Sequence, residues 1–546
     1  MTLPLPPALT DPKSLFAQLE SAAFPASIGM LLRQAAQDRS SQPALRLISG
    51  ESFTYAELLS SVSAAAGALI ESGVTRTSRI AILLSNIAEY PVVYLAAATL
   101  GACVVPINTA YTAAEIEYVL RDSGATFAIV EERLRPAFDQ AAGGIEKLPA
   151  GHILVVNGLD EERCWSRRCA AASAVLTDAG TLDSLMTIQY TSGTTGFPKG
   201  ALLSQRYWLT VGFAQNVELA HLDVRNILVV HSFFYMDPFW QLVLSFLLRG
   251  TVVLAPRMSA THFMSWVREF DIHYALVTSL IFKQPPNDLD RTHRLRLLQT
   301  YGFSKEIHRD FEARFQVPVR EVYGMTEIGA GAFLPLAATD MIGSGSVGIA
   351  APFRRLKIVD DSGLEVAQGK VGELWVSGPG MFGGYNNRPE ASADVLTDGW
   401  MRTGDLFRRD EAGYYYLVGR LKDMIRRNME NISTHEVEQA LVGHPGVAQA
   451  AVLAVPDTQK GEEVLALVVL REGADAAEVS PELLREHCAK RLAKFKLPRY
   501  VGYRKSFPMT PSGKIAKGQL RADSADLKVG CYDFVAASWV RGDSPA

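Results

Sequence analysis

The segment "YTSGTTGFPKG", residues 190–200, holds the densest group of residues in the chain that could bind an anion. Glycine lets backbone N–H groups turn toward a phosphate, serine and threonine add hydroxyl donors, and lysine adds a mobile positive charge. The preceding "LMTIQ" has the composition of a buried strand. The GxxxxGK[ST] spacing of a Walker loop is absent. Taken alone, a segment of this composition is more often a flexible surface loop, so its assignment depends on what accompanies it.

Four further side chains could serve phosphoryl or acyl transfer, and they are spread over 192 residues of sequence. Tyr323 and Glu327 lie in "VYGMTEIG", Asp405 ends the triplet "TGD", and Lys514 ends "SGK". Each has an ordinary explanation when taken singly: a half-buried aromatic, a surface charge, a turn cap and a solvated lysine. Only their occurrence together indicates chemistry.

The composition is that of an ordinary globular protein of several domains. A chain of 546 residues is too long for one hydrophobic core and predicts three or four compact units. The 54 basic and 58 acidic residues nearly balance and form no basic block, so we expect no nucleic-acid partner. Five scattered cysteines without a CxxC pair, and ten histidines in no metal spacing, indicate neither a disulfide framework nor a zinc site. A cytoplasmic location fits these features.

Two apolar segments could be mistaken for membrane spans. Residues 90–107 are interrupted by Pro91 and Gly101, and residues 241–256 by Arg249 and Gly250. We expect each to be a buried helix followed by a buried strand, and no transmembrane segment. The N-terminus has no basic region followed by an apolar stretch, so no signal peptide is expected.

The pattern of strands and helices around these residues predicts an α/β protein. Short Val/Ile/Leu runs alternate with amphipathic helices, which indicates mainly parallel strands covered by helices on both faces. The clearest runs are residues 79–85, 102–108, 126–132, 152–157 and 250–255.

Changes in the hydrophobic pattern along the chain predict three parts: two domains and a tail. We expect a large N-terminal domain of mixed, mainly parallel sheets over residues 1–419, with a β-rich subdomain at about 345–419. A small mobile α+β lid follows at 420–525. A tail at 526–546 ends in "RGDSPA", which has a disordered composition.

Six motifs occur in an order that resembles the adenylate-forming superfamily, which includes acyl-CoA synthetases, peptide-synthetase adenylation domains and luciferases. The resemblance covers residues 28–525. The motifs are "FTYAELL" (53–59), the anion-binding segment (190–200), "VYGMTEIG" (322–329), "GELWVSGPGMFGGYNN" (372–387), "GWMRTGDLFRRDEAGYYYLVGRLKDMI" (399–425) and "PMTPSGKIAKGQLR" (508–521).

The resemblance implies a reaction in two steps. A carboxylate attacks the α-phosphate of ATP to give acyl-AMP and pyrophosphate, and a second nucleophile then displaces AMP. ATP and Mg²⁺ are the implied cofactors and CoA the expected co-substrate. Two anions must approach each other in the first step, so catalysis consists mostly of charge neutralisation and in-line positioning.

Residue roles carried over from the family concern mainly ATP. Tyr323 stacks on adenine, Thr326 contacts the α-phosphate, and Glu327 binds Mg²⁺ together with Thr195. The residues implied in binding the phosphates and the adenine are Thr191, Ser192, Gly193, Thr194, Thr195, Gly196, Lys199, Gly302 and Gly324.

The C-terminal motifs imply the remaining roles. Asp405 accepts both ribose hydroxyls and Arg420 also contacts the ribose. Lys514 bridges the substrate carboxylate and the ribose-phosphate oxygens. Lys422 is the hinge about which the lid rotates between the two steps.

The acyl pocket departs from the family pattern. The usual "PLFH" is replaced within "HSFFYMDPFWQL" (231–242), with Tyr235 at the place of the histidine. If Tyr235 and Trp240 line the pocket, the acid has an aromatic, cyclic or medium apolar body, whereas we expect Phe239 to be core. The segment "TYGFSKEI" (300–307) keeps only Gly302 of a Gly-rich motif and weakly resembles the carnitine/crotonobetaine–CoA ligase branch.

The acceptor side departs further. Relatives that make thioesters read "GGEN" or "SGEN" where this chain reads "NMEN", so Asn428 and Met429 lie where the pantetheine tunnel is expected. Met429 either swings aside, which its three rotatable bonds allow, or blocks the tunnel. Two hypotheses remain: a carboxylic acid–CoA ligase, and an amide-forming ligase that takes an amine. An inactive binding protein is disfavoured because Lys514, Glu327 and Asp405 are all present. A homodimer is left open.

Overall fold

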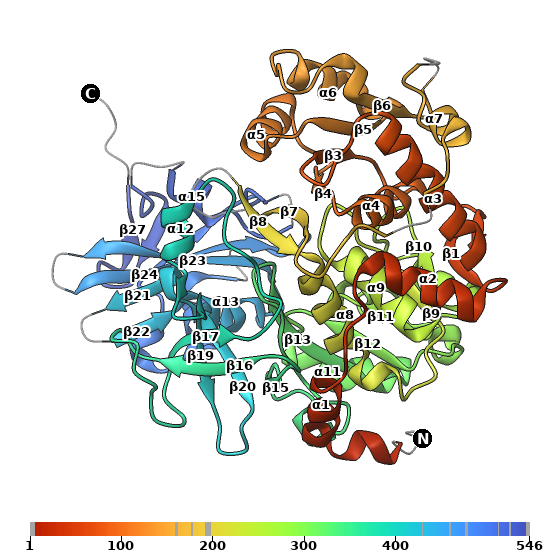
Figure 1. Ribbon diagram of the computed structural model, residues 1–546. Helices are drawn as coiled ribbons and strands as arrows, with labels where there is room; N and C mark the ends of the chain where they lie inside the picture. The colour runs from red at the N-terminus through yellow and green to blue at the C-terminus, as the bar shows by residue number, and fades with distance from the viewer. Residues whose placement is uncertain are drawn as a thin grey trace. The chain divides into compact units, whose positions relative to one another are not determined.

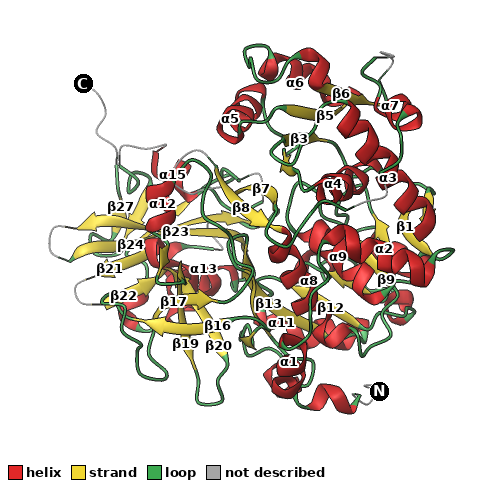
Figure 2. Cartoon of the chain, in the orientation of Figure 1, coloured by secondary structure: helices red, strands yellow, loops and turns green. Residues whose placement is uncertain are grey.

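The computed structural model describes residues 6–158, 162–175, 178–191, 198–427, 430–457, 460–475, 479–510, 513–522 and 526–541 (Figures 1 and 2). The chain divides into two compact units. The first comprises Met1–Thr191, Lys199–Leu356 and Val376–Met401, and the second comprises Ser192–Pro198, Lys357–Trp375 and Arg402–Ala546. The predicted limits at residues 419, 420 and 525 stay predictions. The predicted α/β fold class is confirmed.

The first sheet of the first unit has six strands in the order β6-β5-β3-β4-β7-β8. The strands from β6 to β7 run parallel, and β8 pairs antiparallel with β7. The bounds are β3 Arg79–Leu83, β4 Cys103–Pro106, β5 Phe127–Glu131, β6 Ile153–Val156, β7 Leu185–Thr191 and β8 Lys199–Ser204. The strands predicted in this region are confirmed, and their apolar residues are buried on both faces.

A nine-stranded sheet follows in the order β15-β14-β13-β12-β11-β9-β10-β1-β2. The run from β1 to β13 is parallel, so the carboxyl ends of β9, β11, β12 and β13 meet at one edge. Ligands of open parallel sheets bind at such an edge. The bounds are β1 Pro43–Leu47, β2 Ser52–Thr54, β9 Asn226–Val229, β10 Thr251–Leu254, β11 Tyr274–Leu276, β12 Leu297–Thr300, β13 Val319–Met325, β14 Gly329–Phe333 and β15 Ile349–Ala350.

The helices of the first unit include two that are almost wholly apolar. In α4 every residue except Glu89 is buried, and α9 is buried over most of its length. Each leads into a strand, β4 and β10 respectively, as predicted for the two apolar segments. The bounds are α1 Pro12–Glu20, α2 Ile28–Arg39, α3 Tyr55–Glu71, α4 Glu89–Leu100, α5 Ala113–Ser123, α6 Arg135–Ala142, α7 Trp165–Ala171, α8 Gln205–Leu219, α9 Asp237–Leu248, α10 Phe263–Glu269, α11 Lys305–Phe315 and α12 Pro389–Ala393.

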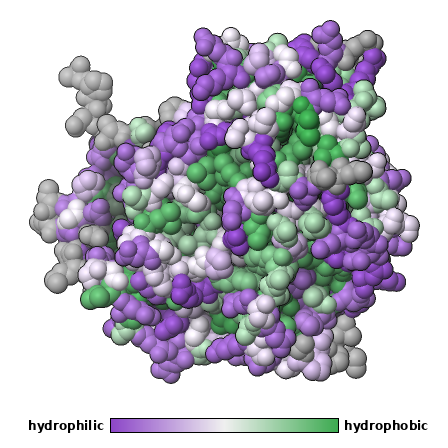
Figure 3. Space-filling model, viewed as in Figure 1, coloured by the Kyte–Doolittle hydropathy of each residue, from purple (hydrophilic) through white to green (hydrophobic). Residues whose placement is uncertain are grey.

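Within the described part of the chain, no helix has both the length and the apolar character that a bilayer crossing requires. Figure 3 shows hydrophilic residues over much of the displayed surface and hydrophobic residues in smaller groups between them.

Residues 355–420 form mainly strands with tight turns. A third sheet has the order β16-β17-β19-β18, and β20 pairs with β19. The long strands β19 and β20 run antiparallel, which sets residues far apart in sequence opposite each other. The bounds are β16 Arg355–Val359, β17 Gly372–Ser377, β18 Leu396–Thr397, β19 Trp400–Arg409 and β20 Tyr415–Arg420.

The rest of the second unit is an α+β layer structure with apolar clusters on both faces of its sheet. The strand order is β22-β21-β24-β25-β26-β27, and β23 pairs with β24. The bounds are β21 Met424–Arg427, β22 Glu430–Ser433, β23 Val447–Asp457, β24 Gly461–Leu470, β25 Tyr500–Tyr503, β26 Cys531–Asp533, β27 Ser538–Trp539, α13 Thr434–Val442, α14 Pro481–Ala489 and α15 Lys517–Ala522.

Part of the segment predicted as a tail is integral to this sheet. Strand β26 pairs antiparallel with β25, and β27 pairs with β26. Arg499 donates from Nε to Asp533 Oδ1 and from Nη2 to Asp533 Oδ2, both at 3.1 Å, and its Nη1 donates to Asp457 Oδ2 at 2.6 Å. One arginine therefore ties three strands together. Residues 542–546, including most of "RGDSPA", lie outside the described residues.

This arrangement predicts that Asp533→Asn loosens the C-terminal edge of the sheet. The variant removes the charge from a bidentate, largely buried pair, so we expect a loss of about 1.5–3 kcal/mol in local stability. Hydrogen exchange measured over residues 531–539 should become faster. Glu486→Gln is the matched control because it removes an exposed ion pair with Lys490. Unchanged exchange in Asp533→Asn would contradict the prediction.

Candidate active site

The carboxyl end of β13 carries three of the predicted ATP-binding residues. Tyr323 is a buried residue of β13, and Thr326 and Glu327 lie in the turn that leads to β14. A Cβ added to Gly331 of β14 would lie 3.1 Å from Tyr323 Cδ1, so glycine makes room for the ring. Glu327 is only 6% exposed. The ring of Tyr323 and the carboxylate of Glu327 therefore lie toward the carboxyl edge of the sheet, where ligands of open parallel sheets bind.

Sequence reasoning missed Glu321, which fixes the predicted adenine-side loop. Glu321 lies on β13, and its carboxylate accepts hydrogen bonds from the backbone N–H groups of Gly302 (3.1 Å) and Phe303. Gly302 has φ +68°, a conformation that favours glycine. Burial raises the pKa of Glu321 to about 8, although the two backbone donors act in the opposite direction. The turn after β12 is therefore anchored on the strand that carries Tyr323.

A second missed residue, Tyr385, contacts two predicted site residues. Its Oη donates to Glu327 Oε1 at 2.7 Å, and Lys199 Nζ lies 5.0 Å from the centroid of its ring. Tyr385 belongs to the "GGYNN" end of a motif to which sequence reasoning gave no residue roles. The order of glycines and tyrosine in that motif was the available signal, but it did not indicate that the tyrosine contacts Glu327 and Lys199.

The predicted phosphate loop is described only at its ends. Ser192, Gly193, Thr194, Thr195 and Gly196 lie outside the described residues. In the β7–β8 pair, Thr191 lies opposite Lys199. Tyr190 Oη donates to Asp122 Oδ2 at 2.7 Å, which fixes the strand end that precedes the loop.

The predicted acyl-pocket residues follow β9. Tyr235 is half-buried, whereas Trp240 is fully buried in α9, where its Nε1 donates to Asp237 Oδ1 at 3.1 Å. Tyr301 Oη, at the end of β12, donates to the same oxygen at 3.3 Å. Asp237 thus joins the loop after β9 to the loop after β12.

Phe239 belongs to the core, as predicted. It is fully buried between Tyr94 and Trp208, with ring centroids 4.6 and 5.0 Å away.

The second unit groups the predicted ribose and lysine residues. Asp405 on β19 lies opposite Arg420 on β20, and Arg420 Nε contacts Asp405 Oδ1 at 2.7 Å. Partial burial lowers the pKa of the Lys514 ammonium, the Arg420 guanidinium lowers it further, and the Asp405 carboxylate raises it. The three charges therefore lie within electrostatic reach of one another.

The lysine is carried by a tight turn. Met509 and Ile515 form an isolated antiparallel bridge, Gly513 has φ +76°, and Lys514 N donates to Thr510 Oγ1 at 3.1 Å. Thr510 N also donates to Lys514 O at 2.7 Å, so the backbone of Lys514 is held against that of Thr510.

The predicted hinge and tunnel positions lie between β20 and β22. Lys422 is in a short 3₁₀ turn, Leu421–Asp423, that connects β20 to β21. Asn428 and Met429 lie outside the described residues.

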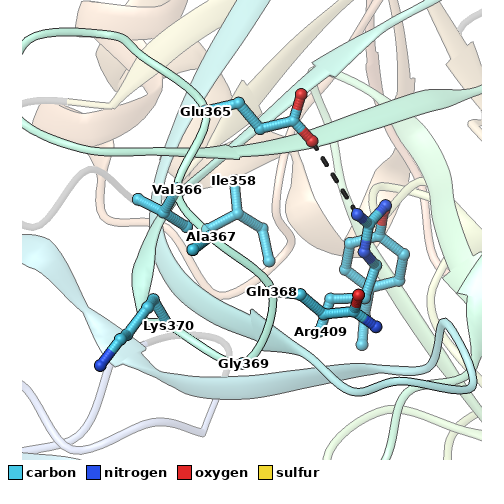
Figure 4. Close-up of a pocket in the computed structure, with 9 residues that line it drawn as sticks. Ile358, Glu365, Val366, Ala367, Gln368, Gly369, Lys370 and Arg409 are labelled. Carbon is cyan, nitrogen blue, oxygen red and sulfur yellow. Dashed lines mark ion pairs between the residues drawn. The ribbon is translucent and has the colours of Figure 1, made fainter.

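The second unit also contains a small pocket, which is lined by other residues than the predicted site residues. Figure 4 shows the loop of residues 365–370 beside Ile358 and Arg409, and Arg409 Nη2 lies 4.0 Å from Glu365 Oε1. Tyr415 also lines this pocket. None of the predicted site residues is among those that line it.

A magnesium ion fits the carboxylate of Glu327. Among the described residues, no group of three or more His, Cys, Asp or Glu side chains is arranged so that it could hold a metal ion. Mg²⁺ does not need one, because it usually keeps several waters and binds one or two carboxylates together with substrate phosphates. A single buried carboxylate has the oxygen-donor chemistry that such a site requires.

Comparison with known proteins agrees with this geometry. Residues 32–386 match the AMP-binding enzyme family, and residues 436–514 match the AMP-binding enzyme C-terminal domain. The chain is 33% identical to a long-chain-fatty-acid–CoA ligase, FadD13, of Mycobacterium tuberculosis (86% of this chain, 92% of the relative). It is 30% identical to a crotonobetaine/carnitine–CoA ligase of Salmonella enteritidis (86% and 93%).

A solved structure gives the same result. ATP-bound MatB from Rhodopseudomonas palustris superimposes with a TM-score of 0.83 at 26% identity, covering 92% of this chain and all of that one. The predicted resemblance is confirmed over nearly the whole chain. The chain therefore belongs to the AMP-binding enzyme family and is an adenylate-forming ligase.

Proposed function

We propose that this ligase activates a carboxylic acid with ATP, releases pyrophosphate, and transfers the acyl group from acyl-AMP to CoA. The two relatives named above are CoA ligases, and each aligns with 86% of this chain. That breadth of similarity favours a thioester product over an amide. The observation that carries the activation step is the grouping of Lys514, Arg420 and Asp405, because one turn and one strand pair supply a cation beside a ribose-binding carboxylate.

Glu327 and Lys199 handle the phosphates in this proposal. Mg²⁺, when bound, withdraws electron density from the phosphoryl oxygens and neutralises charge that develops on the leaving pyrophosphate. Glu327 supplies a hard oxygen ligand, with Thr195 as a second. Thr326 lies one residue before Glu327 in the same turn and donates its hydroxyl to the α-phosphate. Lys199, at the start of β8, balances the phosphate charge that the 191–196 segment binds through N–H and hydroxyl groups.

The nucleotide base lies along β13. Tyr323 offers its ring to adenine, and Gly302 and Gly324 present backbone without a side chain in the way. The hydrogen bond that Gly302 donates to Glu321 holds this glycine in place, so the adenine site is set before ATP arrives.

Lys514 stabilises the first transition state. The acid and the α-phosphate are both anions, and an ammonium between them offsets their repulsion. Asp405 and Arg420 hold the ribose, which fixes the nucleotide relative to the lysine.

Lys514→Ala tests this role. We expect acid-dependent pyrophosphate release to fall about 100-fold or more, the range seen when a preorganised charge donor is removed. Lys490→Ala, an exposed lysine of the same unit, is the matched control and should keep the wild-type rate. Undiminished pyrophosphate release in Lys514→Ala would refute the assignment.

The acceptor step depends on the hinge and the 428–431 segment. Lys422 lies in the short turn between two strands, where a few backbone angles can rotate everything that follows. Met429 stands where CoA relatives have glycine, so it must move its flexible side chain aside for the pantetheine arm. The second step is therefore more sensitive to Met429 than the first.

A product assay with Met429→Gly tests the acceptor. The purified enzyme receives ATP and acid together with CoA or a panel of amines, and products are read by mass spectrometry. We expect acyl-CoA from the wild type. In Met429→Gly, thioester formation should rise about tenfold, because overpacking costs roughly 1–3 kcal/mol. The rate of the first burst of pyrophosphate release, measured without CoA, should stay unchanged. Amides instead of thioesters from the wild type would contradict the proposal.

The acid has an aromatic, cyclic or medium apolar body. Half-buried Tyr235 supplies a ring with a polar end. We assign Trp240 to the same pocket; it is fully buried, and its indole donates to Asp237. The names of the two relatives, a long-chain-fatty-acid and a crotonobetaine/carnitine ligase, span very different acids. The pocket residues are therefore the better guide.

Tyr235→Ala tests the pocket assignment. We expect kcat/KM for substituted benzoates and phenylpropanoates to fall about 10- to 100-fold, since a ring–ring contact and its buried area are lost. Values for acetate should stay within twofold. Tyr235→Phe keeps the ring and removes the hydroxyl, so it shows which of the two contributes to kcat/KM. Equal losses for aromatic acids and acetate would show that Tyr235 does not select the acid.

A further inference from the structure

The segment around Tyr385 is held on one side by the strand that follows the phosphate loop. Gly383 N donates to Leu202 O at 2.8 Å, and Asn386 N donates to Gly200 O at 2.8 Å. Tyr385 itself forms an antiparallel bridge with Ala201 of β8. Its backbone position is therefore fixed relative to Lys199, the first residue of β8.

The same segment is held on the other side by Glu327. Phe382 N donates to the backbone oxygen of Glu327 at 2.9 Å, and Tyr385 Oη donates to its carboxylate Oε1 at 2.7 Å. Tyr385 is 9% exposed and Glu327 6%, so the second bond is made in a largely dry environment. A hydrogen bond from a hydroxyl to a buried carboxylate is among the stronger ones that side chains make.

The phenol ring also contacts a cation. Lys199 Nζ lies 5.0 Å from the ring centroid, within the range of a cation–π interaction. One side chain thus meets a lysine with its face and a glutamate with its hydroxyl. Without it, an ammonium and a carboxylate in a low-dielectric site would attract each other directly. Such a pair would neutralise the two charges that the phosphates and the metal require.

We propose that Tyr385 is a positioning residue that separates Lys199 from Glu327 and holds Oε1 of Glu327, so that the other carboxylate oxygen is directed to Mg²⁺. This inference rests on the proposed role of Glu327 as the metal-binding carboxylate. It gives the "GGYNN" motif a chemical role, because the motif then keeps a cation for phosphate and an anion for metal apart at close range.

Equilibrium binding of ATP to Tyr385→Phe tests the proposal without turnover. Phenylalanine keeps the ring, its packing on Phe382 (5.1 Å between centroids) and its contact with Lys199, and removes only the hydroxyl. Titration calorimetry in Mg²⁺ should show ATP affinity about tenfold weaker than wild type. In EDTA, metal-free ATP should bind as in the wild type, within twofold. The half-saturating Mg²⁺ concentration for pyrophosphate release should rise by the same factor.

Two further variants make the outcome decisive. Tyr416→Phe removes a similar hydroxyl–carboxylate bond, to Asp410 at 2.9 Å, and should change neither affinity. Glu327→Gln should lose the affinity that Mg²⁺ adds to ATP binding. If Glu327→Gln keeps it, the proposed role of Glu327 fails first. If Glu327→Gln loses the affinity that Mg²⁺ adds, the result for Tyr385→Phe decides. Wild-type affinity for Mg·ATP, or an equal loss of affinity with and without metal, would overturn the positioning role of Tyr385.

Discussion

Repulsion between two anions is the constraint on which this structure depends. A carboxylate must approach a triphosphate, and water would screen the two charges without orienting them. In the function proposed above, cations and a metal-binding carboxylate lie on rigid elements, where a low dielectric strengthens each electrostatic interaction. Those same charges attract one another, so the proposed function requires Lys199 and Glu327 to stay apart while both act on the phosphates. The ring and hydroxyl of Tyr385 meet that requirement.

Two kinds of strand pairing place the groups. In the first unit, parallel strands bring the ends of β9, β12 and β13 to one edge, so the loops predicted to line the acyl and adenine sites start from the same edge. Hydrogen bonds from Tyr301 to Asp237 and from Gly302 to Glu321 fix those loops. In the second unit, the antiparallel pair β19–β20 sets Asp405 against Arg420.

The strands and the two buried helix–strand pairs could be predicted from the sequence, whereas the roles of the site residues come from motifs and stay predictions. Val/Ile/Leu runs report burial directly, and motifs report residues that are close in sequence. Glu321 and Tyr385 were missed because each acts through a hydrogen bond to a residue that is distant in sequence. Phe303 is 18 residues from Glu321, and Glu327 is 58 residues from Tyr385. Strands β26 and β27 were missed for a similar reason: only the pairing with β25, and the arginine that ties Asp533 to Asp457, show that the segment is part of a sheet.

Acid-dependent exchange of labelled pyrophosphate into ATP tests the central claim most directly. Formation of acyl-AMP is reversible, so the enzyme with ATP, Mg²⁺ and a suitable acid should incorporate label into ATP in the absence of CoA. Omitting the acid should abolish the exchange. Exchange that proceeds without acid, or a reaction that yields ADP and phosphate instead of AMP and pyrophosphate, would contradict carboxylate adenylation by this chain.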